Sequence, residues 1–345
     1  MQIIPKRYLK ERHRDHFNML PFRTQRIFIL MLLLAMLWIP QQANSYVLGL
    51  VLQAMIAVVG AIGLNFVVGF TGQVSIGQAA YMAIGAYATA VLTGPFGVPF
   101  LVALPIAGLI TAAASVLVGW PTLRLRGFYL AMATFAVHFL VIIAISRWQF
   151  VGAQTGMQVN RPAFATDDIA FYYMVFAIVV VMVHVAFNIE HSFLGRAWGA
   201  IRDRDLAAAA AGISLARFKL WANAWSGFYV GIAGGLFAVF LSYISPENFP
   251  FFLTVQYLGM LLVGGMGTTL GGIFGALFMT LIPELVRFMP VIFGVSESVS
   301  PTLLADVQLT LFGVIIIGTL IFAPKGLFGL WEDIKLYFRT WPFRY

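Results

Sequence analysis

The stretch Val47–Phe70 reads VLGLVLQAMIAVVGAIGLNFVVGF and carries no charged side chain. A helix that spans the hydrocarbon core of a bilayer needs about 20 predominantly apolar residues. The whole chain of 345 residues has the same bias, with 61% apolar and 10% charged residues. Since a water-soluble domain carries about 25% charged residues, we expect much of this surface to face lipid.

Other apolar stretches repeat this pattern along the chain. Uninterrupted stretches are 98–120, 127–146, 169–187, 220–241 and 303–322, and 27–39 extends to about residue 43. Stretches interrupted by glycine are 76–93, 252–265 and 270–288. We therefore predict an all-α polytopic membrane protein with about ten transmembrane helices. The exact count stays open around 71–75 and 266–269, because irregular backbone is tolerated at membrane depth where protein buries it.

The basic residues predict the orientation of these helices. If the N-terminus lies in the cytoplasm, all 21 Lys and Arg residues fall on the cytoplasmic side except Arg147, Arg161 and Arg287. The positive-inside rule describes this asymmetry, which favours an N-in/C-in topology in the bacterial inner membrane. Because the basic residues cluster in tails and loops, the net charge of +8 does not indicate a nucleic-acid partner.

This topology divides the chain into segments. The predicted segments are a basic cytoplasmic N-terminal tail (1–26), a first group of transmembrane helices (27–187), a cytoplasmic coupling loop (188–219), a second group of transmembrane helices (220–322) and a cytoplasmic C-terminal tail (323–345). The first apolar segment is interpreted as an uncleaved anchor. A cleaved signal peptide is the alternative, although its charged region would be unusually long.

Few residues suggest catalysis. The sequence has no phosphate-binding G-x-x-x-x-G-K-[ST] loop, no G-x-S-x-G and no zinc-spaced cluster, and it has no cysteine. His138 is interpreted as a hydrogen-bonded packing residue in preference to a proton relay, and Glu284 and Arg287 as an ion pair on one helix face. Ion-coupled carriers usually depend on intramembrane carboxylates, so their scarcity argues against such a carrier. Because no catalytic cluster is present, we expect a chain that is not an enzyme and holds no cofactor.

The loop 188–219 and the neutral polar residues supply the candidate sites. Gly195 and Gly212 are predicted to end helical pieces, and the alanines between them favour helix, so we expect two short helices. Small residues and amides elsewhere either pack helices together or line a path for an uncharged or zwitterionic solute. The candidates for such a path are Asn65, Gln73, Ser75, Gln78, Asn223, Gly264 and Gly265.

Several motifs resemble the permeases of branched-chain amino acid ABC transporters, in particular their M-type subunit. They match in order over most of residues 55–330. The matching runs are GQVSIGQAA at Gly72–Ala80, IGAY at Ile84–Tyr87, LRLRGFY at Leu123–Tyr129, GRAWGAIRD at Gly195–Asp203, LVGGMGT at Leu262–Thr268, PEL at Pro283–Leu285 and APKGLFG at Ala323–Gly329.

The resemblance implies an ABC importer permease fold and a set of partners. These are a second related permease, two cytoplasmic ATPases that bind the ATP, and a solute-binding protein outside the membrane. The residues implied to dock an ATPase are Gly195, Arg196, Ala200, Ile201, Arg202, Asp203, Asp205, Ala207, Ala208 and Gly212. Leu206 stands where the ABC permease motif usually has glutamate, and the adjacent Asp205 can take over that role.

The substrate stays open at this point. Branched-chain or related small amino acids are the first expectation from the resemblance. Urea or short-chain amides are the alternative, because permeases for them belong to the same wider family and Gln78 replaces the histidine of the usual motif. A facilitator independent of ATP, or an ion-coupled carrier, is a further alternative.

Overall fold

The computed structural model describes residues 23–125, 127–292, 301–323 and 325–340. Most of the predicted tail 1–26 therefore lies outside the described residues. The helices are α2 (Arg23–Gln42), α3 (Ser45–Asn65), α4 (Gln78–Thr93), α5 (Phe100–Thr122), α6 (Phe128–Arg147), α7 (Asp168–His191), α8 (Phe193–Asp203), α9 (Asp205–Ala210), α10 (Leu215–Leu241), α11 (Phe251–Gly264), α12 (Thr269–Ile292), α13 (Pro301–Phe322) and α14 (Gly326–Thr340).

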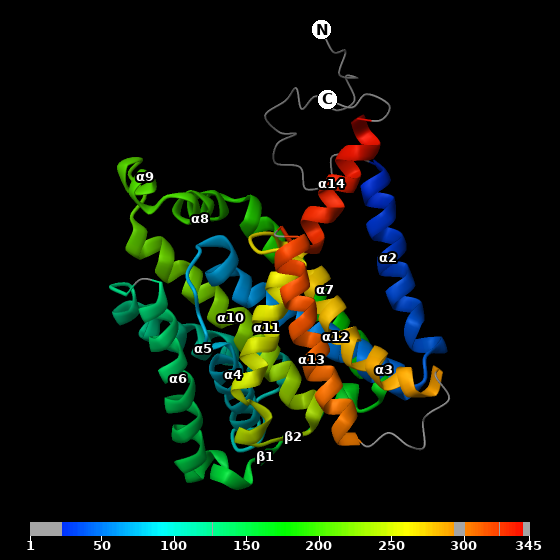
Figure 1. Cartoon of the computed structure of the whole chain (residues 1–345). Coiled ribbons are helices and arrows are strands. Elements are labelled where there is room, and N and C mark those ends of the chain that lie inside the picture. The colour runs from blue at the N-terminus through cyan, green and yellow to red at the C-terminus, as the bar shows by residue number, and fades with distance from the viewer. Residues whose placement is uncertain (1–22, 126, 293–300, 324, 341–345) are drawn as a thin grey trace.

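The strands are short and lie at one end of the helical bundle. Strand β1 (Met157–Gln158) pairs antiparallel with β2 (Tyr243–Ile244), with Met157 opposite Ile244. Figure 1 places this sheet opposite α8 and α9, which project from the other end. We call these two ends the β1–β2 end and the α8 end.

Six of the helical segments within the described ranges are long and apolar enough to cross a membrane. They are Ser45–Phe70, Phe100–Thr122, Phe128–Arg147, Asp168–His191, Leu215–Leu241 and Thr269–Arg287. The predicted class, an all-α multi-pass membrane protein, is confirmed. The count of about ten transmembrane helices and the N-in/C-in orientation stay predictions.

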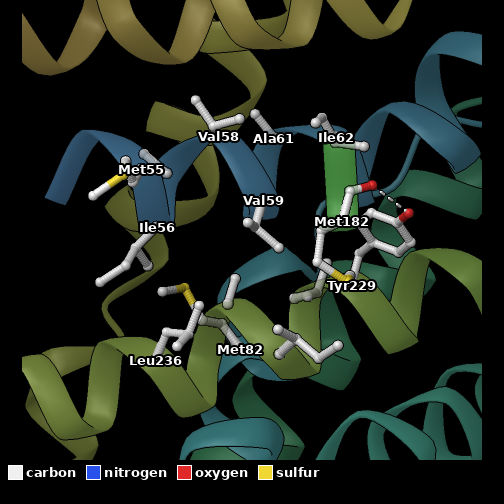
Figure 2. Close-up of a cluster of buried hydrophobic side chains, with 14 of the residues drawn as sticks. Met55, Ile56, Val58, Val59, Ala61, Ile62, Met82, Met182, Tyr229 and Leu236 are labelled. Atoms are coloured by element: carbon white, nitrogen blue, oxygen red, sulfur yellow. Dashed lines mark hydrogen bonds between the residues drawn. The ribbon is translucent and has the colours of Figure 1, made fainter. Parts of the chain in front are cut away.

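Helix α3 forms the centre of the bundle because it is apolar on every side. A helix that is hydrophobic all round has to be buried by its neighbours, and α3 packs against α7, α10, α11 and α12. Figure 2 shows its side chains above Met82 of α4 and Leu236 of α10. The buried hydroxyl of Tyr229 donates a 2.8 Å hydrogen bond to the carbonyl of Met182, so α10 is tied to α7 beside this core.

The backbone is irregular at two places where the sequence left the helix count open. Helix α3 continues as a π-helical turn, η2 (Phe66–Phe70), and residues 71–77 then pass as a non-helical segment into the bundle before α4 begins (Figure 1). Residues 265–268 form a tight turn between α11 and α12. We refer to these as the 71–77 segment and the 265–268 turn.

Helix α4 is too short to cross a bilayer by itself. Its 16 residues span about 24 Å at 1.5 Å per residue, whereas the hydrocarbon core is about 30 Å thick. The 71–77 segment and α4 together make one pass through the bundle. The first turn of α4 therefore lies inside the protein, where its N–H groups need partners.

Candidate functional site

The predicted coupling loop contains two short helices, as expected from its alanines. Helix α7 continues to His191, and Ser192 begins α8 by accepting a 3.1 Å hydrogen bond from the N–H of Leu194. The expectation that Gly195 ends a helical piece is wrong. Gly195 lies within α8, where a side chain would overlap the carbonyl of Glu190, and the helix break falls at Ser192. Gly212 does lie at a turn, with a φ of +85°.

Helix α8 has an inward face and an outward face. Ala197, Trp198 and Ile201 are buried against the bundle and form the inward face, together with Gly195. Among the other predicted coupling residues, Ala208 is buried, and Ala200 and Asp205 are half-buried. The exposed ones are Arg196, Arg202, Asp203, Ala207 and Gly212. Asp205 pairs with Lys219 at 3.0 Å, which ties α9 to the start of α10.

Trp198 holds α8 on the bundle and was not identified from the sequence. Its side chain is fully buried, and its indole N–H donates a 2.8 Å hydrogen bond to the carbonyl of Phe218 on α10. Its ring meets Phe66 edge-on with centroids 5.8 Å apart and lies 6.3 Å from Phe70. Ala197, Trp198 and Ile201 share one helix face. This apolar spacing is the sequence signal from which a buried face of α8 could have been predicted.

The 265–268 turn is held by polar side chains from several helices. Asn65 accepts a 3.0 Å hydrogen bond from the N–H of Gly267 and donates one of 2.8 Å to the carbonyl of Thr268. Glu190, at the end of α7, accepts a 3.0 Å hydrogen bond from the N–H of Thr269. A carboxylate is stabilised at a helix N-terminus, so Glu190 caps α12. Sequence reasoning had given Glu190 no role.

The predicted path residues do not all lie together. The structure brings Gln73, Ser75 and Asn223 to one small cavity, and the remaining candidates lie elsewhere. Gln78 donates to the carbonyl of Gly60 at 2.9 Å, and Asn65 holds the 265–268 turn. Gly264 packs against the start of α12 and Gly265 against the backbone of Lys325, so close approach accounts for both glycines.

The small cavity lies between the 71–77 segment and helices α5, α6 and α10. Its volume is about 10 Å³, close to the space that one water molecule needs. In this conformation there is accordingly no room for an amino acid. The lining residues are Val67, Gln73, Val74, Ser75, Tyr81, Val118, Gly119, Thr122, Leu130, Thr134 and Asn223.

Hydroxyl groups satisfy part of the buried backbone beside this cavity. Thr134 accepts a 2.9 Å hydrogen bond from the N–H of Ile76, and Thr254 accepts one of 3.0 Å from the N–H of Ala79. Within the described ranges, the peptide groups of Val74 and Ser75 and the hydroxyl of Ser75 have no hydrogen-bond partner. Val74 is exposed and Ser75 half-buried, and unpaired polar groups at the surface of a membrane protein are expected to face water or a polar solute.

The remaining predicted polar residues agree with the sequence interpretation in part. His138 packs between the rings of Phe139 and Phe251, but the expected hydrogen bond is absent at its buried Nδ1, which has no partner among the described residues. Glu284 pairs with Arg287 at 3.4 Å, as predicted. Glu284 also accepts a hydrogen bond from the hydroxyl of Tyr46 at the start of α3. No three His, Asp or Glu side chains in the described part of the chain are grouped so as to hold a metal ion.

Comparison with known proteins identifies related sequences. Residues 46–323 match the family described as branched-chain amino acid transport system / permease component. The chain is 33% identical to the high-affinity branched-chain amino acid transport system permease protein LivM of Escherichia coli (strain K12), covering 76% of this chain and 69% of the relative. LivM of Salmonella typhimurium (strain LT2) is 32% identical with the same coverage. No solved structure matches the chain.

Proposed function

Because the chain belongs to the family of branched-chain amino acid transport permease components, we propose that it is a permease subunit of an ATP-driven importer of branched-chain or related small amino acids. The membrane would be the bacterial inner membrane. The observation that carries the proposal is the pair α8–α9, which projects from the α8 end of the bundle with an exposed outward face. A partner ATPase can bind this face without entering the membrane.

The proposed complex contains a second related permease, two ATPases and an external solute-binding protein. The ATPases bind ATP, so this chain itself needs no cofactor. Two large apolar side chains support a docking surface on α8–α9, because Leu206 is 81% exposed and Phe193 is 63% exposed. Large apolar side chains exposed together often mark a protein contact. We assign Phe193, Leu206 and the neighbouring alanines to the ATPase contact.

Leu206→Asp is expected to weaken ATPase binding about tenfold or more. Burying a leucine side chain stabilises a contact by roughly 1.5–3 kcal/mol, and about 1.4 kcal/mol is a tenfold change in Kd. Co-purification of the partner ATPase with the permease measures this loss, and Leu206→Met is the matched control. Unchanged binding by Leu206→Asp, with equal amounts of protein in the membrane, would remove Leu206 from the contact.

The 71–77 segment is the proposed wall of the translocation path. The peptide groups of Val74 and Ser75 have no hydrogen-bond partner and line the small cavity together with the side-chain amides of Gln73 and Asn223. All of these groups are polar and uncharged. The N-terminal end of a helix that begins inside a membrane favours negative charge. A zwitterionic amino acid suits such a wall, because its carboxylate would meet the start of α4. The small cavity indicates that the path is shut in this conformation and opens when the helices move.

Ser75→Leu is expected to reduce solute uptake at least tenfold without loss of ATPase binding. The leucine side chain would fill the cavity beside Asn223 and hold the path shut. The initial rate of uptake by the assembled transporter is the measurement, and Ser75→Ala, which adds no volume, is expected to retain most of the rate. Full uptake by Ser75→Leu would place the path elsewhere.

Reconstitution tests the proposal as a whole. The permease pair, the ATPases and the binding protein are assembled in proteoliposomes, and uptake of labelled leucine, alanine, urea and acetamide is measured with and without ATP. We expect uptake of leucine that requires both ATP and the binding protein. Uptake by the permease alone would indicate a facilitator or an ion-coupled carrier, and uptake of urea or acetamide in place of leucine would indicate an amide permease.

A further inference from the structure

Helix α8 touches the bundle at both places where the backbone is irregular. Trp198 packs on η2, which leads into the 71–77 segment. Four residues further along the same helix, Arg202 reaches the 265–268 turn, which leads into α12. Residues four apart lie on the same side of a helix, so one rigid helix contacts both irregular segments.

The side chain of Arg202 lies between Gly72 and Gly267 and is in close contact with the 265–268 turn. Its guanidinium donates a long hydrogen bond, 3.4 Å, to the carbonyl of Met266. A side chain at Gly267 would lie 3.0 Å from Cζ of Arg202 and would overlap its Nη1 atom. On the other side, a side chain at Gly72 would lie 3.6 Å from Cγ of Arg202. Arg202 therefore fits between the start of the 71–77 segment and the 265–268 turn.

The two irregular segments are also joined to each other. Asn65, at the end of α3, bonds both Gly267 and Thr268, and Gly69 of η2 packs against this amide. Closely packed side chains transmit a displacement because they have little free volume to absorb it. A shift of α8 relative to the bundle would therefore move η2 and the 265–268 turn together.

We propose that Arg202 and Trp198 are positioning residues that transmit a movement of α8 to the 71–77 segment and to α12. The proposal rests on the proposed function, in which a partner ATPase moves α8. It differs from the sequence-based expectation that Arg202 contacts the ATPase, because the guanidinium is directed at Met266 and Gly267 of its own chain. Arg202 would act through the 265–268 turn and touch neither the solute nor the ATPase.

The test uses Arg202, since the fully buried Trp198 cannot be removed without loss of packing. Arg202→Gln and Arg202→Lys are compared with Arg217→Gln, which removes an exposed arginine whose side chain has no hydrogen-bond partner among the described residues. Each variant is assembled with its ATPases, second permease and binding protein in proteoliposomes. Co-purification of the ATPase, the rate of ATP hydrolysis and the solute taken up per ATP are measured.

We expect Arg202→Gln to bind the ATPase within twofold of wild type and to hydrolyse ATP, while uptake per ATP falls at least tenfold. Arg202→Lys should recover part of this ratio, and Arg217→Gln should keep it. An unchanged ratio for Arg202→Gln would overturn the proposal, and so would a loss of ATPase binding, which would make Arg202 an ATPase contact. Failure of the proposed function is distinct, because then the wild-type complex itself shows no ATP-dependent uptake.

A second measurement tests the contact without any transport. Gly267→Ala is expected to lower the melting temperature of the purified permease, both through its φ of +84° and through overlap with Arg202. In an Arg202→Ala background the positive φ and the 3.0 Å approach to the carbonyl of Gly69 remain but the overlap with Arg202 is gone, so the same substitution should lower the melting temperature by less. Gly97→Ala has a positive φ of +61° and open space, and it should show no such dependence on Arg202. Equal losses for Gly267→Ala in both backgrounds would overturn the contact on which the proposal rests.

Discussion

Asn65→Leu is expected to lower the free energy of unfolding of the permease by about 2–6 kcal/mol. The amide of Asn65 is fully buried and makes hydrogen bonds of 3.0 and 2.8 Å to the backbone of Gly267 and Thr268. Leucine has a similar volume but pairs with neither group. Each buried polar group left without a partner costs about 1–3 kcal/mol.

The melting temperature of the purified permease measures this loss. Asn188→Leu on α7 is the matched control, because Asn188 is exposed and its side chain has no hydrogen-bond partner in the described part of the chain. A surface change of this kind is usually within about 0.5 kcal/mol of neutral. The result also separates two roles of Asn65. Had its amide served only to line a path, as the sequence suggested, Asn65→Leu would reduce uptake and leave the melting temperature unchanged.

Gly234→Ala is expected to destabilise the bundle by about 3 kcal/mol or more. At Gly234 the backbones of α10 and α4 approach so closely that a side chain would overlap the carbonyl of Met82 and lie 3.0 Å from the N–H nitrogen of Ala86. Overpacking costs typically about 1–3 kcal/mol. Backbone cannot move aside as a flexible side chain can, so the effect should fall at the upper end of this range or above it.

The amount of folded permease in the membrane and its melting temperature measure this effect. Gly49→Ala on α3 is the control, because a side chain there would have no atom within 4 Å. Alanine is favoured over glycine within a helix by about 0.5–1 kcal/mol, so this variant should be as stable as wild type or slightly more stable. Equal behaviour of the two variants would contradict the close crossing of α4 and α10.

The sequence predicted the class of the protein because lipid imposes a simple requirement on each segment. Apolar stretches such as Val47–Phe70 have to become helices, since their backbone groups find no partner in hydrocarbon. The loop 188–219 was predicted to hold two short helices from its glycines and alanines, and α8 and α9 confirm this. Only the break moved, from Gly195 to Ser192, because a serine hydroxyl can cap a helix and the glycine was needed for packing.

The sequence was less informative about the roles of single polar residues. Asn65, Gln73 and Asn223 are all amides in apolar surroundings and are alike in the sequence. In the fold, Asn65 holds a turn that lies about 200 residues further along the chain, whereas Gln73 and Asn223 reach the small cavity. The role of an amide depends on which distant backbone comes within hydrogen-bonding distance, and local composition does not contain that information.

By itself, then, the sequence determined the helical membrane class, the position of the projecting loop and the family, because these depend on segment hydrophobicity and on short motifs. The tertiary structure alone decided which helices break inside the bundle, which glycines are required by contact, that Trp198 is buried against the bundle, and that Arg202 reaches the 265–268 turn. The physical reason is that a close contact is a property of two segments at once, and its energy depends on distances that neither segment specifies alone.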